Sequence, residues 1–173
     1  MANTYQLIAS NTLSSSAASV TFSSIPATYT DLVLKISART NYGSISDYIQ
    51  LVINGTTANY SDTTLWGDGA STFSLRNSNA SLSEVSTMSA NNATANAFGN
   101  SEIYIPSYTA SQNKPIGAFG VAESNTTSFG TSFGVVADAS LWRNTAAITS
   151  ITIDAYGTYQ SGSSFFLYGI KNS

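Results

Sequence analysis

Carboxylates are the residues of this chain whose chemistry comes nearest to catalysis. The chain has nine Asp and Glu residues but no histidine and no cysteine, which excludes a histidine general base, a thiol nucleophile and thiolate metal ligands. A glycosidase needs only two carboxyl groups at a suitable separation, and the candidates are Asp62, Asp68, Glu84, Glu102, Glu123 and Asp138. Their spacing follows no catalytic motif. We therefore expect no enzyme activity and no catalytic residue.

Two of these carboxylates, Asp62 and Asp68, lie near each other in the sequence and form the best candidate for a calcium site. Calcium prefers several oxygen ligands gathered on one loop, but this spacing does not match an EF-hand loop. The glycine-containing segments near Gly99 and at residues 128–134 lack the lysine and the strand–helix context of a phosphate-binding loop. The sequence therefore predicts no metal ion and no cofactor.

Exposed aromatic rings offer a different chemistry, because they stack on the apolar faces of sugars. The chain has two tryptophans, Trp66 and Trp142. Trp142 follows an alternating apolar segment, so we expect it to pack in the core. Trp66 precedes Gly67 and Gly69, so we expect it in an exposed loop. Trp66 is therefore the predicted glycan contact of an alternative function, in which the protein binds sugars.

Charge is scarce along the whole chain. Six Lys and Arg oppose nine Asp and Glu, and charged residues make up 9% of the sequence against about 25% in an ordinary soluble domain. The scattered basic residues make no stripe that would bind nucleic acid, and no apolar run is long enough to span a membrane. The first residues lack the pattern of a secretory signal, so we expect the chain to be made in a cytoplasm. Because its surface carries so little charge, the chain suits a subunit that is held in a fixed array.

The dominant period in the sequence is two, which is typical of β-strands. Residues 31–39 place Leu32, Leu34 and Ile36 on one face, and residues 48–53 end in Asn54-Gly55, a pair that favours a tight hairpin turn. We expect its return strand to end near Tyr60. Further strands are expected at residues 5–9, 19–22, 102–105, 116–121, 133–141, 151–155 and 164–170. The strand expected at residues 133–141 has its apolar face at Phe133, Val135, Ala137, Ala139 and Leu141.

These strands predict a single all-β domain over residues 1–173, an antiparallel two-sheet sandwich of jelly-roll type. No segment keeps a helical spacing, so we expect at most a short helical turn, within residues 140–147. The alternation weakens over residues 66–100, which we interpret as a loop-rich insertion with two or three short strands. Such loops commonly carry the binding surface of a rigid sandwich.

Three segments also resemble a known group of proteins. Residues 5–39, residues 104–115 with the sequence YIPSYTASQNKP, and residues 147–173 are similar to small structural proteins of tailed bacteriophages. The likeness rests on running similarity and leaves out most of residues 66–100. It offers no catalytic residue to carry over.

What the resemblance implies is a virion component similar to jelly-roll head decoration, or cement, proteins. Such proteins are made in the cytoplasm of the host bacterium and sit on the outer surface of the head, where homotrimers bridge subunits of the major capsid protein. The alternative is a tail or fibre-associated module that binds a host surface glycan, with Trp66 as its contact. The predicted inter-subunit contact is the N-terminal segment, Met1, Ala2, Asn3, Thr4 and Tyr5.

Overall fold

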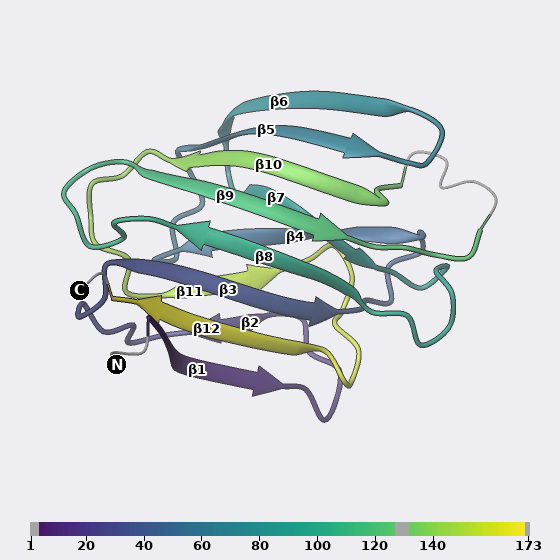
Figure 1. Cartoon of the computed structure of the whole chain (residues 1–173), viewed down its shortest axis with the longest axis horizontal. Coiled ribbons are helices and arrows are strands. Elements are labelled where there is room, and N and C mark those ends of the chain that lie inside the picture. The colour runs from purple at the N-terminus through teal and green to yellow at the C-terminus, as the bar shows by residue number, and fades with distance from the viewer. Residues whose placement is uncertain (1–3, 127–131, 172–173) are drawn as a thin grey trace.

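Two antiparallel β-sheets pack face to face in the computed structural model, which describes residues 4–126 and 132–171. Figure 1 shows the large sheet in front and the small sheet behind it. In spatial order the large sheet contains β1 (Tyr5–Thr12), β12 (Ser164–Ile170), β3 (Asp31–Ala38), β8 (Gly99–Ile105), β9 (Lys114–Val121), β10 (Val135–Trp142), β5 (Tyr60–Gly67) and β6 (Thr72–Ala80). The small sheet contains β2 (Val20–Phe22), β11 (Ile151–Asp154), β4 (Ser46–Ile53) and β7 (Ser83–Ser89).

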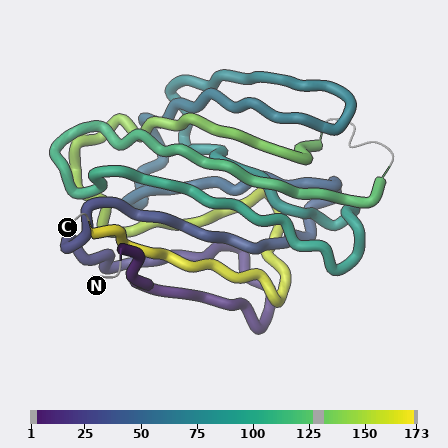
Figure 2. The backbone as a smooth tube through the Cα atoms, viewed as in Figure 1, coloured from purple at the N-terminus to yellow at the C-terminus, as the bar shows by residue number. Residues whose placement is uncertain are grey.

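The strand order confirms the predicted jelly-roll sandwich. One half of the large sheet runs β1-β12-β3-β8 and the small sheet runs β2-β11-β4-β7, so the chain alternates between layers as two Greek keys require. Figure 2 shows the first and last strands of the chain side by side. Two hairpins, β5–β6 and β9–β10, are inserted into this chain order and extend the large sheet beyond β8. We call these four strands the extension.

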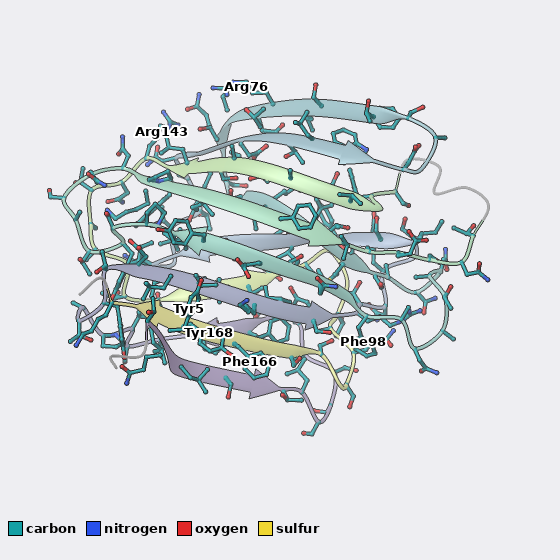
Figure 3. All side chains as sticks on the ribbon, in the orientation of Figure 1. Tyr5, Arg76, Phe98, Arg143, Phe166 and Tyr168 are labelled. Carbon is teal, nitrogen blue, oxygen red and sulfur yellow. The ribbon has the colours of Figure 1, made fainter. Side chains whose placement is uncertain are left out.

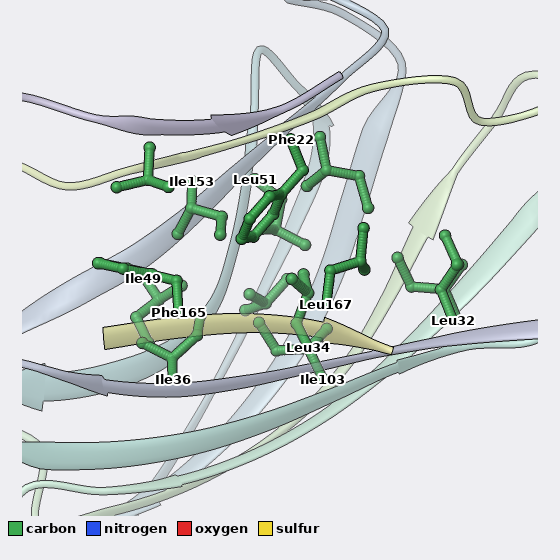
Figure 4. Close-up of a cluster of buried hydrophobic side chains, with 14 of the residues drawn as sticks. Phe22, Leu32, Leu34, Ile36, Ile49, Leu51, Ile103, Ile153, Phe165 and Leu167 are labelled. Atoms are coloured by element: carbon green, nitrogen blue, oxygen red, sulfur yellow. The ribbon is translucent and has the colours of Figure 1, made fainter. Parts of the chain in front are cut away.

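A core of aliphatic and aromatic side chains fills the space between the sheets, and Figure 4 shows its centre. Alternation sends Leu32, Leu34 and Ile36 of β3 inward, as predicted, and Phe165 and Leu167 of β12 join them. The small sheet contributes Ile49, Leu51, Ile53, Ile151 and Ile153, none of which exposes any surface. The period-two pattern therefore predicted the inward faces of β3, β4 and β11 correctly, whereas it left open which face of β12 is buried.

The predicted turn at Asn54-Gly55 is present, but the predicted hairpin is wrong. Asn54 and Gly55 have φ values of 51° and 67°, and the Thr56 N–H donates to the Ile53 carbonyl over 2.9 Å. The following chain does not pair with β4. It crosses to the large sheet, where Tyr60 begins β5. The turn residues determine the local reversal, whereas the jelly-roll order determines which strand lies beside β4.

The predicted face of β10 is inverted. Val135, Ala137 and Ala139 point outward and are exposed, while Asp138 and Trp142 point inward and are buried. Trp142 was expected in the core and is fully buried there. Residues 140–142 continue β10, so the helical turn expected within residues 140–147 is absent. No helix occurs in the described part of the chain.

The segment predicted as loop-rich, residues 66–100, holds two long strands. β6 has nine residues and β7 has seven, joined by a tight connection. Residues 68–71 form a short turn and residues 90–98 a longer loop. Arg39 anchors the longer loop, because its guanidinium donates to the carbonyls of Thr94, Ala97, Asn91 and Ala93 over 2.8 to 3.2 Å. Ser, Asn and Thr weaken the apolar alternation of β6 and β7, and this weakness explains why the pattern missed their length.

The contrast between buried and exposed phenylalanines gives a test of the sandwich. Phe165→Ala should lower the free energy of unfolding by about 3–5 kcal/mol, because it leaves a cavity between the sheets. Phe119→Ala should change it by only about 0.5 kcal/mol, because Phe119 lies on the outer face with 54% of its surface exposed. Urea denaturation followed by circular dichroism measures both values. Equal losses for the two variants would contradict the assigned faces.

Candidate functional site

The outer face of the extension carries a contiguous group of apolar side chains. Register places Ala137 of β10 directly between Phe119 of β9 and Leu65 of β5. The next outward residue of β10 toward its N-terminus, Val135, lies opposite Val121 of β9. Directly opposite residues in an antiparallel pair have their side chains in contact range on the same face. We call this group the outer patch: Leu65, Phe119, Val121, Val135, Ala137, Ala139 and Leu141.

The outer patch is exposed because none of the described residues covers this side of the large sheet. Leu65, Phe119 and Val135 expose 57%, 54% and 47% of their surfaces. Small residues separate them, so the patch is flat near its centre, at Ala137, Ala139 and Gly117. A contiguous exposed apolar patch of this kind typically marks an interaction surface, and its location on paired strands holds it rigid.

A charged pair marks the border of the outer patch. Lys35 of β3 and Glu102 of β8 lie opposite each other, 2.7 Å apart and half exposed. The Glu102 carboxylate raises the pKa of Lys35 by accepting its hydrogen bond and by its charge. A shallow hollow surrounds the pair and is walled by Phe119 on one side and by Phe166 and Tyr168 on the other. An exposed pair of this kind contributes little stability.

The predicted N-terminal contact lies at the far edge of the same face. Tyr5 begins β1 and is 49% exposed, and its ring meets that of Tyr168 edge-on at 6.3 Å. Figure 3 shows Tyr5, Phe166 and Tyr168 gathered over β1 and β12. Thr4 is exposed, while Met1, Ala2 and Asn3 lie outside the described residues. No partner chain tests the role predicted for this segment.

Two carboxylates are buried under the extension, on its inner face. Asp62 of β5 exposes 2% and Asp138 of β10 exposes 7% of its surface. Burial raises the pKa of Asp138 to about 6, although its carboxylate accepts hydrogen bonds from the hydroxyls of Thr64 and Ser140. Burial also raises the pKa of Asp62, which accepts a 2.9 Å hydrogen bond from Asn77. No described cation pairs with either group, so their ionisation opposes folding.

Of the other candidate carboxylates, the structure brings one near this buried pair and separates the rest. Glu84 of β7 lies near the buried pair and accepts hydrogen bonds from Gln50 and Tyr156. Glu102 lies on the opposite face of the large sheet, and Glu123 accepts the backbone N–H of Ser124. Of the six candidates, therefore, only Asp62, Glu84 and Asp138 belong to one neighbourhood.

The calcium site considered at Asp62 and Asp68 is not formed. Asp62 faces inward on β5, whereas Asp68 follows the other end of that strand and caps a turn by accepting the N–H groups of Ala70 and Ser71. Six residues of extended chain separate the two carboxylates by about 20 Å. Among the described residues, no three His, Cys, Asp or Glu side chains are gathered as metal ligands, and no helix is long and apolar enough to cross a membrane.

Trp66 does not lie in an exposed loop. It is the penultimate residue of β5 and is half buried on the inner face. Phe73 stacks on its ring at 5.3 Å and Phe133 meets it edge-on at 5.1 Å, so much of the indole is covered. Its Nε1 is buried and has no hydrogen-bond partner among the described residues. The prediction of an exposed loop failed because residues 60–67 pair fully with β10.

Sequence reasoning missed a longer array of rings of which Trp66 is one member. Ring contacts of 4.6 to 5.8 Å connect neighbours in the order Tyr42, Tyr156, Tyr48, Phe133, Trp66 and Phe73, which we call the aromatic series. It runs from the small sheet to the extension. Tyr156 exposes 57% of its surface, and it borders a hollow lined by Gln50, Asp62, Asn77 and Glu84. No spacing of aromatic residues within one segment predicts this array, because its members come from separate segments between residues 42 and 156.

Comparison with models of known protein families finds no match, and comparison with curated proteins finds none either. The resemblance to bacteriophage structural proteins therefore remains an expectation drawn from the sequence. The outer patch, the aromatic series and the buried carboxylates are the structural features that bear on the function.

Asp138 makes stability depend on pH. Free aspartate titrates near pH 3.9 and buried Asp138 near pH 6, so between these values the folded state binds more protons. The free energy of unfolding should therefore fall as pH rises from about 4 to 6, by about 3 kcal/mol. Asp138→Asn should remove most of this loss, which urea denaturation across that pH range measures.

Asp68→Asn provides the matched control, with the opposite sign. Two backbone N–H groups lower the pKa of Asp68, so its contribution to stability is present at neutral pH and is lost as the pH falls. An unchanged pH profile in Asp138→Asn would contradict the burial of that carboxylate.

Proposed function

We propose that this protein is a non-catalytic structural subunit of a tailed-bacteriophage virion, which docks on the major capsid protein and stabilises the shell from the outer surface of the head. The observation that carries the proposal is the outer patch on the extension. A rigid, flat and apolar face without a covering element fits a protein partner better than it fits a small molecule, which needs a concave site. The sequence resemblance supplies the virion context.

The size of the protein agrees with such a role. Its described residues expose 8119 Å², and a standard protein interface takes about 800 Å² from each partner. One tenth of the surface is therefore enough for a coat contact, and much remains for neighbours. A modest single contact suffices in a regular array, because linked copies gain effective concentration.

The inner carboxylates favour a structural role over hydrolysis. Asp62 and Asp138 are almost fully buried and accept hydrogen bonds from neighbouring Asn77, Thr64 and Ser140. A retaining or inverting glycosidase needs both carboxyl groups to flank a substrate bond. These carboxylates instead hold polar side chains together under the extension.

Ala137→Arg tests the docking face. Ala137 lies at the centre of the outer patch, so a bulky cation there should weaken binding to shells by at least about thirtyfold, or about 2 kcal/mol. Cosedimentation with expanded shells assembled from the major capsid protein of the same genome measures the affinity. Thr21→Arg is the control, because Thr21 is exposed on β2 of the small sheet and should leave the affinity unchanged. Equal weakening by both variants, or no shell binding by the unaltered protein, would contradict the proposal.

A second candidate function is favoured by the aromatic series. Tyr156 presents an exposed ring beside Gln50, Asn77 and Glu84, a combination that suits stacking on a sugar and hydrogen bonding to its hydroxyls. The Glu84 carboxylate accepts the Tyr156 hydroxyl and raises its pKa to about 12, which keeps that ring neutral. In this alternative the protein is a tail or fibre module that binds a host surface glycan, and Tyr156 replaces Trp66 as the main contact.

A glycan array separates the two candidates. If the alternative holds, the protein binds a surface glycan. Tyr156→Ala then reduces that binding at least about tenfold, because the sugar loses the aromatic ring on which it stacks. Tyr104→Ala is the control, because Tyr104 is 40% exposed on the large sheet, far from the aromatic series. The decoration function instead predicts no glycan binding above background for either variant or for the unaltered protein.

A further inference from the structure

β6 is an open sheet edge of unusual length. It pairs with β5 on one side only, and seven of its nine residues are exposed. Figure 1 shows it at the upper edge of the large sheet. The backbone N–H and C=O groups on its free side have no strand beside them, and such a row is a template for another strand.

The other three sheet edges carry protection that residues 72–78 of β6 lack, since the one register irregularity of β6 lies beyond them, between Ser78 and Ala80. β1 has a register irregularity between Leu7 and Ala9, β2 has only three residues, and all residues of β7 except Glu84 are buried. Bulges, short length and cover are the usual means by which a sheet edge avoids pairing. β6 has regular register from Thr72 to Ser78 and no proline, and Arg76 is its only charge.

We propose that β6 pairs with β6 of a second copy, antiparallel and about a two-fold axis at Ser74, so that two large sheets become one continuous sheet. An isologous contact of this kind uses the same patch on both copies. It lies at the edge of the sheet and not on its outer face, so it is independent of the docking proposed for the outer patch.

The side chains of β6 select this register. A two-fold axis perpendicular to the sheet keeps outward residues opposite outward ones, so only residues of equal parity can face each other. Centred on Ser74, the pairing sets Phe73 against Leu75 of the second copy. These side chains are 40% and 46% exposed in the single chain and would cover each other in the pair.

Charge argues for the same register. Centred on Ser74, each Arg76 faces Thr72 of the second copy, and the two guanidinium-bearing residues are about 13 Å apart along the strands, beyond the screening length of about 8 Å. Centred on Arg76, the two cations would lie directly opposite each other, which is unfavourable. Centred on Leu75, Phe73 would face Asn77. Figure 3 shows Arg76 at this free edge.

The contact is small, so the pairing should be weak and depend on concentration. Interfaces below about 1,200 Å² are typically transient, which places the dissociation constant in the range of about 10 µM to 1 mM. The expected product is a dimer, whereas the phage resemblance implies a trimer. A closed trimer needs a heterologous contact and would not use β6 against itself.

A single cysteine tests the register, because the chain has none of its own. Directly opposite residues have Cα atoms about 4.5–5.5 Å apart, within reach of a disulfide, so Ser74→Cys should oxidise to a covalent dimer. Ser78→Cys is the matched control on the same face of the same strand. Its two copies would lie about 26 Å apart and should stay monomeric. Equal cross-linking of both variants would overturn the register.

Sedimentation velocity between 10 µM and 1 mM then tests the non-covalent pair. The unaltered protein should shift from monomer toward dimer, Ser74→Lys should lower the dimer fraction at least tenfold, and Ser78→Lys should not change it. A monomer over the whole range, or a trimer insensitive to Ser74→Lys, would overturn the proposal. Shell binding measured with Ala137→Arg reports on the outer patch separately, so failure of one proposal is distinguishable from failure of the other.

Discussion

The small sheet covers the inner face of the large sheet only in part, and this unequal cover decides where the molecule is dry and where it meets solvent. β7 packs across β8, β9, β10 and β5, while β6 has its main contacts with β5 alone. Between β3, β12 and the small sheet the layers bury aliphatic side chains on both sides. Toward the extension the apolar filling gives way to Asp62, Thr64 and Asp138. Beside them Tyr60, Ile116 and Trp142 of the extension still join the core, while Leu65, Phe119 and Val135 are exposed on its outer face.

Unlike a typical sandwich, the extension buries carboxylates on its inner face and exposes apolar side chains on its outer face. Burying a carboxylate is unfavourable unless its hydrogen bonds are satisfied, and Asp138 retains its place because two hydroxyls donate to it. An exposed Leu65 or Phe119 forgoes the gain that burial would bring. Both features weaken the isolated domain. They are understandable in a protein whose apolar surface is completed by contact with another molecule, as the proposed docking of the outer patch provides.

Local alternation predicted the sandwich, the apolar face of β3, and the turn at Asn54-Gly55, because each depends on a few adjacent residues. It failed at β10, where Val135, Ala137 and Ala139 face outward and Asp138 is buried between Val136 and Trp142. A rule that sends apolar residues inward cannot choose the buried face of a strand with apolar residues on both faces. It also missed the aromatic series and the neighbourhood of Asp62, Glu84 and Asp138, since both depend on contacts between distant segments.

The two inserted hairpins have a consequence for how such a molecule can diversify. A hairpin leaves a sheet edge and returns to it, so β5–β6 begins and ends near the small sheet and lets the chain resume the jelly-roll order at β7. Each hairpin still joins the core, because Tyr60 of β5, Ile116 of β9 and Trp142 of β10 are buried in it. A change in the length of either hairpin beyond these buried residues would alter the breadth of the exposed outer face, while the jelly-roll order of the other strands would stay the same.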